Sequence, residues 1–292
     1  MQRAIGVQVA RRNFRAAVVA AAIVVAAIAA ALVIALGRRG SDLGARCGPG
    51  FAATGARCLV PADRTGCPAP LVSTPAGCDA PRTTAFVPSA SIAVGPSDWE
   101  AQGRVRSRSV RVQAFRIDAF EVTRGRAGLA GDAARAASGI PRDEAAAFCA
   151  SAGGRLPTED EWIVAAASAM NPPRRYPWGD TGAVCRRAAW GLEGACAHGA
   201  DGPDTVGAHP TGDSPLGLHD LAGNVAEWVA DDADDADGAD GSDAGTPDVP
   251  MGVVKGGSWR DTQASELRIW ARRQVPVAAR DASVGFRCVY AP

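Results

Sequence analysis

The sequence predicts an α+β domain with little regular secondary structure, placed after an N-terminal transmembrane helix. Three observations predict this fold class. An unbroken apolar run extends from Ala16 to Leu36, and all eight cysteines follow it. Beyond the cysteine-rich part, only two segments carry helical signals. The remainder is dense in Gly, Pro and Trp, which is typical of ordered loops and short strands.

The apolar run is long enough to cross a bilayer. A helix of 21 residues, rising about 1.5 Å per residue, spans the roughly 30 Å hydrocarbon core. Basic residues before the run favour an N-terminus on the cytoplasmic side. We therefore expect a cytoplasmic segment at residues 1–15 and a signal anchor at residues 16–37. The rest of the chain would be exported, to a periplasmic or extracellular location. A cleaved signal peptide is the alternative, although its apolar region normally covers only about 7–15 residues.

The cysteines favour disulfides over a metal site. An even number of cysteines in an exported chain is typical of an oxidising compartment, and none has the spacing of a zinc ligand set. Within residues 38–85, which are rich in Cys, Pro and Gly, two loops have equal length. They extend from Cys47 to Cys58 and from Cys67 to Cys78. We expect two hairpins, each closed by its own disulfide, in a stalk; a binding knob is the alternative.

The main domain is expected at residues 86–292. Alternating apolar residues predict strands at Val110–Phe115 and Arg116–Val122. Pro141 is predicted to begin a helix that Gly153 and Gly154 end.

A second helix is predicted just after the first. Thr158 and Glu161 form a capping box, which marks the start of a helix that buries Trp162.

The neutral charge conceals an uneven distribution. The chain has 31 basic and 31 acidic residues, and eight of the Asp residues lie between Asp231 and Asp248. We interpret residues 231–248 as a solvated, flexible insert, because Ala233 stands where a calcium-binding loop needs its first acid. With no basic run in the sequence, nucleic acid is excluded as a partner.

Six motifs in order give the chain a resemblance to the sulfatase-modifying-factor family, whose founding member is the formylglycine-generating enzyme. The motifs are IDAFEVT (117–123), GRLPTEDEW (154–162), YPWGD (176–180), GLHDLAGNVAEW (217–228), KGGSW (255–259) and GFRC (285–288). The resemblance implies a C-type-lectin-like fold whose loops are held by disulfides or calcium. It also implies a disulfide between Cys149 and Cys288, which leaves Cys185 and Cys196 as a local pair.

The same resemblance argues against the family's best-known reaction. Active members oxidise a cysteine of a sulfatase peptide with oxygen and Cu(I), using two thiols between the GGS and GFRC motifs. An ungapped match places these positions at Ser265 and Trp270, and no cysteine lies between Trp259 and Arg287. Soft sulfur ligands select Cu(I), so we expect no copper cofactor and no catalytic residue of this kind.

Other catalytic chemistries have little support in the sequence. Three histidines are present, His198, His209 and His219, without recognisable metal-ligand spacing. The motifs of hydrolases and phosphate-binding loops are absent.

Calcium is the cofactor that the resemblance implies most directly. Carried over by position, its ligands would be Asp220 and Glu227 with the carbonyls of Gly223 and Val225, a set of hard oxygens that suits Ca²⁺. A buried cap on loop amides is the alternative role for Glu227. A second family site is in doubt, because Ala188 stands where its Asn would be, although Asp201 keeps the other side.

These observations predict a membrane-anchored, exported domain that acts as a binding or scaffold module. Its partner would be an unidentified exported protein or glycan. The alternative is a family enzyme with a divergent active site, either formylglycine-generating or another oxidase-type modifier of proteins.

Overall fold

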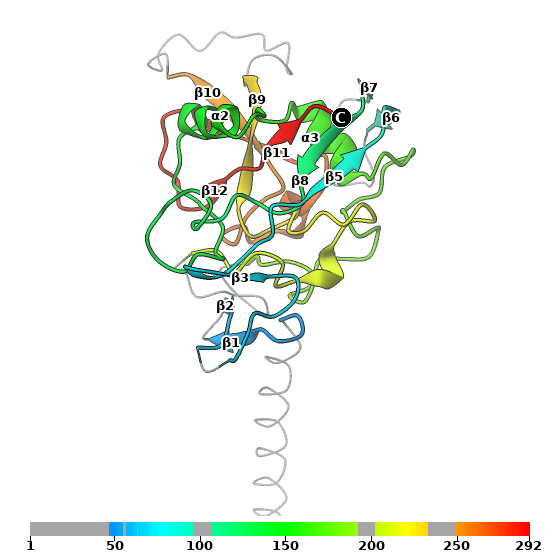
Figure 1. The fold of residues 1–292 in the computed structure, drawn as a ribbon. Coiled ribbons are helices and arrows are strands. Elements are labelled where there is room, and N and C mark those ends of the chain that lie inside the picture. Colours follow the sequence, from blue (N-terminus) through cyan, green and yellow to red (C-terminus); the bar gives the residue numbers. More distant parts are fainter. Residues whose placement is uncertain (1–46, 55–56, 63, 96–106, 192–201, 233–248) are drawn as a thin grey trace, which may run out of the picture. The chain divides into compact units, whose positions relative to one another are not determined.

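The computed structural model describes residues 47–292, apart from residues 55–56, 63, 96–106, 192–201 and 233–248 (Figure 1). The chain divides into two compact units, residues 1–45 and residues 46–292. The expected signal anchor at residues 16–37 lies outside the described residues. Among the residues that are described, no helix is long and apolar enough to cross a membrane.

Two disulfide-closed hairpins begin the described chain. The first pairs β1 (Ala52–Thr54) with β2 (Arg57–Leu59), and the second pairs β3 (Val72–Thr74) with β4 (Gly77–Asp79). Each hairpin is closed as expected, by the Cys47–Cys58 and Cys67–Cys78 bonds. Strands of three residues bury too little apolar surface to hold a hairpin without such a crosslink.

The hairpins pack against the body of the domain rather than standing apart from it. Leu71 is buried in one apolar cluster with Ala119, Phe120 and Val206. The amide of Gly48 donates to the carbonyl of Ala208 at 2.7 Å. The domain boundary that we expected at residue 85 therefore does not coincide with a gap between packed units. Short, aperiodic loops give no sequence signal for this packing.

A three-stranded sheet joins distant parts of the chain, in the order β13-β8-β5. Its strands are β5 (Thr84–Val87), β8 (Phe115–Asp118) and β13 (Val289–Tyr290). Two further strands lie between β5 and β8 in the sequence, where β6 (Ala90–Val94) pairs with β7 (Arg108–Val112). The alternation in the sequence sets the faces, so that Val110, Val112, Phe115 and Ile117 are buried.

Two helices form where the sequence predicts them. Helix α2 (Arg142–Ser151) follows Pro141, carries acids in its first turn, and ends before Gly153, which has a φ of 81°. Helix α3 (Glu159–Ala166) begins at Thr158, and both hydrogen bonds of the capping box with Glu161 are present. These signals are local, which is why they could be predicted from the sequence.

A second sheet, in the order β11-β10-β9-β12, forms the other part of the core. Its strands are β9 (Ala226–Asp232), β10 (Met251–Lys255), β11 (Arg272–Pro276) and β12 (Val284–Gly285), with β12 parallel to β9. Two short 3-10 helices, η2 (Pro210–Gly212) and η4 (Ala264–Leu267), interrupt the loops. Few helices, short strands and long loops fit the C-type-lectin-like class.

A disulfide between Cys149 and Cys288 links α2 to the C-terminal strand. Both sulfur-bearing residues are fully buried, in a cluster with Trp228 and Phe286. The crosslink closes a loop of 139 residues, and long loops gain most from closure in the chain-entropy model.

We expect removal of this crosslink to be costly. The Cys149→Ala/Cys288→Ala variant should lose about 5 kcal/mol of unfolding free energy in urea titrations. The matched Cys67→Ala/Cys78→Ala variant, whose loop has 11 residues, should lose about 3 kcal/mol. Equal losses in the two variants would contradict the loop-closure argument.

Candidate functional site

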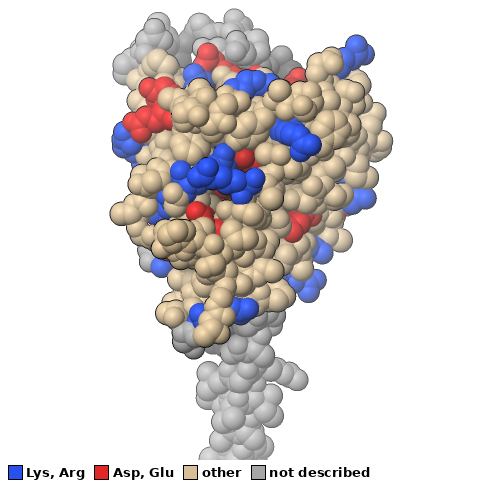
Figure 2. All heavy atoms as spheres, viewed as in Figure 1, with Lys and Arg blue, Asp and Glu red and all other residues tan. Residues whose placement is uncertain are grey.

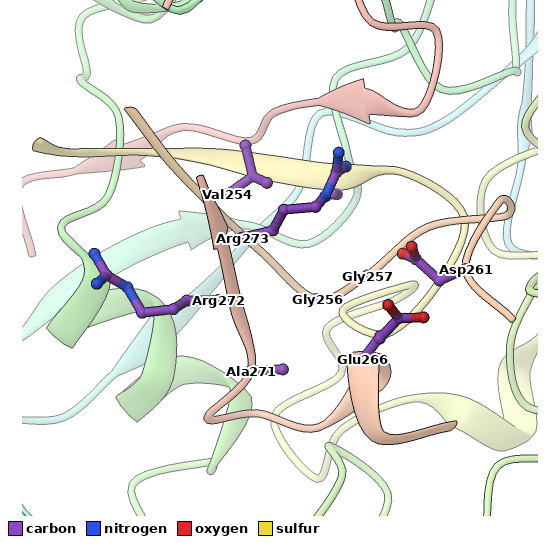
Figure 3. Close-up of a pocket in the computed structure, with 9 residues that line it drawn as sticks. Val254, Gly256, Gly257, Asp261, Glu266, Ala271, Arg272 and Arg273 are labelled. Atoms are coloured by element: carbon purple, nitrogen blue, oxygen red, sulfur yellow. The ribbon is translucent and has the colours of Figure 1, made fainter. Parts of the chain in front are cut away.

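A pocket of about 170 Å³ lies between β10, η4 and β11 (Figure 3). Two residues of the KGGSW motif, Gly256 and Gly257, form part of its lining and have φ values of 88° and 67°. A Cβ added to these glycines would lie 2.7 Å from the carbonyl oxygen of Leu221 and 2.8 Å from that of Glu266, respectively. Both glycines are therefore required for the turn that forms the pocket. The lining residues are Ala226, Val254, Gly256, Gly257, Asp261, Glu266, Ala271, Arg272 and Arg273.

Two carboxylates, Asp261 and Glu266, form one side of the pocket, and Figure 3 shows them on the side of Gly257. Asp261 accepts hydrogen bonds from the amide and the hydroxyl of Ser258, at 2.6 and 3.0 Å. Glu266 accepts one from the amide of Gln263 at 3.2 Å. Partial burial, and next the charge of Asp261, raise the pKa of Glu266. Neither carboxylate forms an ion pair with a described residue, so this side of the pocket is anionic.

The two arginines of the pocket already have acidic neighbours. The Nε atom of Arg272 lies 3.5 Å from Glu159, and Arg273 lies 3.5 Å from Asp281. The charge of Arg273 also lowers the pKa of Glu266, so it partly offsets this carboxylate across the pocket. The neighbouring carboxylates of Asp261 and Glu266 still suit a ligand with a cationic or hydrogen-bond-donating group.

The only lysine, Lys255, is buried next to the pocket floor. Its ammonium donates to Glu159 at 3.1 Å and to the carbonyl of Trp270 at 3.3 Å, and it lies 5.8 Å from the ring centre of Trp162. Burial lowers the pKa of Lys255 to about 8, although Glu159 opposes this shift. With no exposed surface on its side chain, Lys255 supports the fold rather than contacting a ligand.

The positions expected for the family thiols do not line this pocket. Ser265 lies in η4, where its hydroxyl is 3.5 Å from Gln263. Trp270 packs against the main apolar cluster, under the guanidinium of Arg268. Asp261 and Glu266, which do line it, were not predicted from the sequence. The available signal was an Asp and a Glu soon after KGGSW, within the segment that carries the family's thiols.

The GLHDLAGNVAEW motif forms a buried polar cluster behind the pocket. Asp220 accepts from the amide of Gly207 at 2.6 Å. Asn224 donates to Glu121 at 2.6 Å, and Glu121 also accepts from the amide of Val225 at 3.0 Å. Burial, followed by the charges of Asp220 and Glu227, raises the pKa of Glu121 well above its usual value. The roles of Glu121 and Asn224 were not predicted from the sequence, because they depend on tertiary contacts.

Glu227 is the centre of this cluster. Arg287 donates to both of its oxygens, with distances of 2.6 to 2.9 Å. The indole of Trp162 donates to Oε2 at 2.7 Å. Both members of the ion pair are fully buried. Burial opposes the charge of Arg287, but the carboxylate of Glu227 holds the pKa of Arg287 above its usual value.

Arg287 also binds three backbone carbonyls. Its guanidinium donates to the oxygens of Asp118, Ala119 and His219, at 3.1, 3.2 and 2.8 Å. One side chain therefore satisfies oxygens at three places in the chain, at residues 118–119, 219 and 227.

The chemistry of this cluster fits a hard cation. Three buried carboxyl groups, those of Glu121, Asp220 and Glu227, lie around the guanidinium of Arg287, and their oxygens are hard donors. Burial raises the pKa of Asp220, and its bond from Gly207 opposes the shift. Calcium would have to share Glu227 with Arg287. The residues that would hold it are Asp220 and Glu227 with the carbonyls of Gly223 and Val225.

The remaining candidate metal residues have other partners. His209 lies 2.8 Å from Asp204, and His219 stacks on Phe120 and lies 2.9 Å from Asp213. Among the described residues, one trio of ligand-type side chains converges, namely Cys58, Asp204 and His209.

Cys58 is in a disulfide, so that trio has no thiolate. His198 and Asp201 lie outside the described residues, and Ala188 is buried. Cys185 is disulfide-bonded. Its expected partner, Cys196, is outside the described part of the chain, so this pairing stays a prediction.

The ion pair of Glu227 and Arg287 should dominate the stability of the domain. Arg287→Met should cost about 3–5 kcal/mol in urea titrations, because it leaves a buried carboxylate without its partner. Adding Glu227→Gln should restore part of that loss. Arg260→Met, which removes a half-exposed pair at 3.4 Å, should change stability by less than about 1 kcal/mol. Similar losses in Arg287→Met and Arg260→Met would contradict the argument.

Comparison with known proteins agrees with the geometry. The model of the sulfatase-modifying factor enzyme 1-like domain matches residues 130–292. The inactive C-alpha-formylglycine-generating enzyme 2 of Bos taurus is 35% identical over 155 residues, which cover 50% of this chain and 47% of the relative. A hercynine oxygenase of Mycolicibacterium thermoresistibile is 43% identical over 89 residues, 30% of this chain and 19% of the relative. This chain thus spans half or less of each of these relatives.

Among solved structures, PvdO from Pseudomonas aeruginosa has the same fold. It superposes with a TM-score of 0.57 at 21% identity, covering 78% of this chain and 100% of PvdO. The six motifs, the fold and the family match agree with one another. The chain belongs to the sulfatase-modifying factor family, with a domain of the formylglycine-generating-enzyme type.

Proposed function

We propose that this protein is a membrane-anchored, exported binding or scaffold module without copper-dependent formylglycine generation. The observation that carries the proposal is the pocket of Asp261 and Glu266. Carboxylates are hard ligands, whereas Cu(I) needs soft sulfur. The bovine relative is itself named an inactive enzyme, which supports the same interpretation.

Export and anchoring rest on separate features of the chain. The apolar run from Ala16 to Leu36 is long enough to span a bilayer. The disulfides Cys47–Cys58, Cys67–Cys78 and Cys149–Cys288 suit an oxidising compartment. The partner would be an exported protein or glycan, bound through the anionic side of the pocket.

The proposal predicts no copper-dependent turnover. The purified protein, incubated with Cu(I) and a CxPxR-type peptide, should consume no more oxygen than a sample with a Ser-for-Cys peptide. Competition with a chromophoric Cu(I) chelator should show no tight binding, because the pocket offers no thiolate. Peptide-dependent oxygen consumption with Cu(I) would overturn the proposal.

A family enzyme with a divergent active site is the second candidate. The observation that favours it is a solvent-accessible carboxylate pair with a raised pKa at Glu266, in the segment where family enzymes carry their thiols. The match to a protein named hercynine oxygenase supports catalysis without that thiol pair. This candidate would be favoured if the protein turned over a substrate and Glu266→Gln abolished that turnover without lowering the melting temperature of the domain.

We also propose one structural calcium, held by Asp220, Glu227 and the carbonyls of Gly223 and Val225. The grouping of buried carboxyl oxygens in this cluster supports it, because such oxygens are hard donors. A bound Ca²⁺ supplies positive charge and fixes oxygen ligands in place.

Calcium should therefore raise the melting temperature of the domain. A chelator should lower it, and Asp220→Asn should remove most of that sensitivity because the variant lacks one anionic ligand. Asp213→Asn is the matched control, since Asp213 hydrogen-bonds His219 nearby but is outside the ligand set. Melting that is unchanged by chelation would refute the calcium assignment.

A further inference from the structure

The outer face of the β13-β8-β5 sheet carries a second hollow, of about 450 Å³. Register places Thr84 opposite Asp118, and Phe86 and Tyr290 on either side of Arg116. Successive side chains of a strand alternate between faces, so these residues share one face. The opposite face packs into the core through Val87, Phe115, Ile117 and Val289. The outer face is defined as the residues that line this hollow, together with Phe86. The lining residues are Arg82, Thr84, Arg116, Asp118, Arg126, Phe148, Ser151, Ala152 and Tyr290.

One arginine of the outer face is held rigidly. Arg126 donates to Asp118 at 2.7 Å and to the hydroxyl of Tyr290 at 2.7 Å, and it lies 5.6 Å from the ring centre of Phe148. Asp118 also accepts from the amide of Cys288 and from Tyr290. The carboxylate of Asp118 therefore neutralises the charge of Arg126 and also accepts a hydrogen bond from the backbone. It neutralises no other arginine of the outer face.

The other two arginines have no acidic partner among the described residues. Arg116 donates to the hydroxyl of Thr84 at 3.3 Å, which leaves its charge uncompensated. Arg82 is exposed at the start of the same face. Figure 2 shows basic and acidic side chains dispersed over the visible side of the described residues, with uncharged surface between them. The outer face therefore keeps two net positive charges.

Aromatic rings flank these charges. Phe86 is 49% exposed, and the guanidinium of Arg116 lies 6.0 Å from its ring centre. Arginine and aromatic residues are enriched at the energetic centres of protein interfaces. The last carbonyls of α2 lie close by, but the amides of Ala152, Gly153 and Gly154 bind them, which reduces their repulsion of an anion.

We propose that the outer face binds a partner polypeptide through an acidic segment with a neighbouring apolar side chain. Guanidinium groups match carboxylates with two parallel hydrogen bonds, which Arg116 and Arg82 can offer. The exposed ring of Phe86 supplies the apolar contact. Among the described strands β5 has a neighbour on one side alone, so an extended peptide can lie along it. None of these residues belongs to the pocket of Asp261 and Glu266.

The test uses a fluorescein-labelled hexapeptide of glutamates with one central leucine, and a matched peptide with glutamines. Anisotropy should show binding of the acidic peptide alone, weakening as salt increases. Arg116→Gln should weaken binding about tenfold, which corresponds to about 1.4 kcal/mol, and adding Arg82→Gln should weaken it further. Arg116→Lys should lose less, because it keeps the charge without the planar fork.

Arg111→Gln is the matched control, because Arg111 is an exposed arginine on β7. It should change the dissociation constant by less than about twofold, as expected for a charge outside the contact. Equal weakening by Arg111→Gln and Arg116→Gln would overturn the proposal, since it would show non-specific attraction. So would tighter binding of a heparin hexasaccharide or inorganic phosphate than of the acidic peptide. Unchanged melting temperatures would show that the variants remain folded.

Discussion

The buried ion pair between Glu227 and Arg287 is the constraint on which the rest of the structure depends. A domain with short strands and long loops has few β-sheet hydrogen bonds to satisfy its backbone carbonyls. Each buried polar group without a hydrogen bond lowers the stability of the fold. Arg287 binds three such carbonyls and a carboxylate. These oxygens come from segments that are distant in sequence, so one fully buried side chain replaces much of the regular hydrogen bonding that the fold lacks.

The shape of the pocket depends on this buried ion pair. Glu227 holds the indole of Trp162, and a Cβ on Gly256 would lie 3.1 Å from that ring. The turn at Gly256 can therefore approach the core only because the indole is fixed. Residues outside the pocket lining, Trp162 and Glu227, thus help to position the turn that carries the pocket, as expected when a site is built from loops on a rigid support.

Local signals in the sequence were sufficient for the helices and the hairpins. Pro141 and the capping box of Thr158 act within one turn of the chain, so their structural effect can be predicted from neighbouring residues. The packing of Leu71 and the role of Glu121 depend on contacts far away in sequence, and no periodic pattern reports them. The contribution of Asp261 and Glu266 to the pocket has a similar cause, because a pocket is defined in space and its lining comes from separate loops.

The zero net charge of the chain is the sum of regions that carry opposite local charge. The pocket has two carboxylates that form no ion pair with a described residue, and the outer face of the β13-β8-β5 sheet has two arginines without a described acidic partner. Ionised groups left unpaired near a surface cost little stability there, because water screens them, but they remain available for a ligand. A protein that binds a cationic group at one site and an acidic segment at another can join two partners. This separation of opposite charges is the physical basis of the proposed scaffold role.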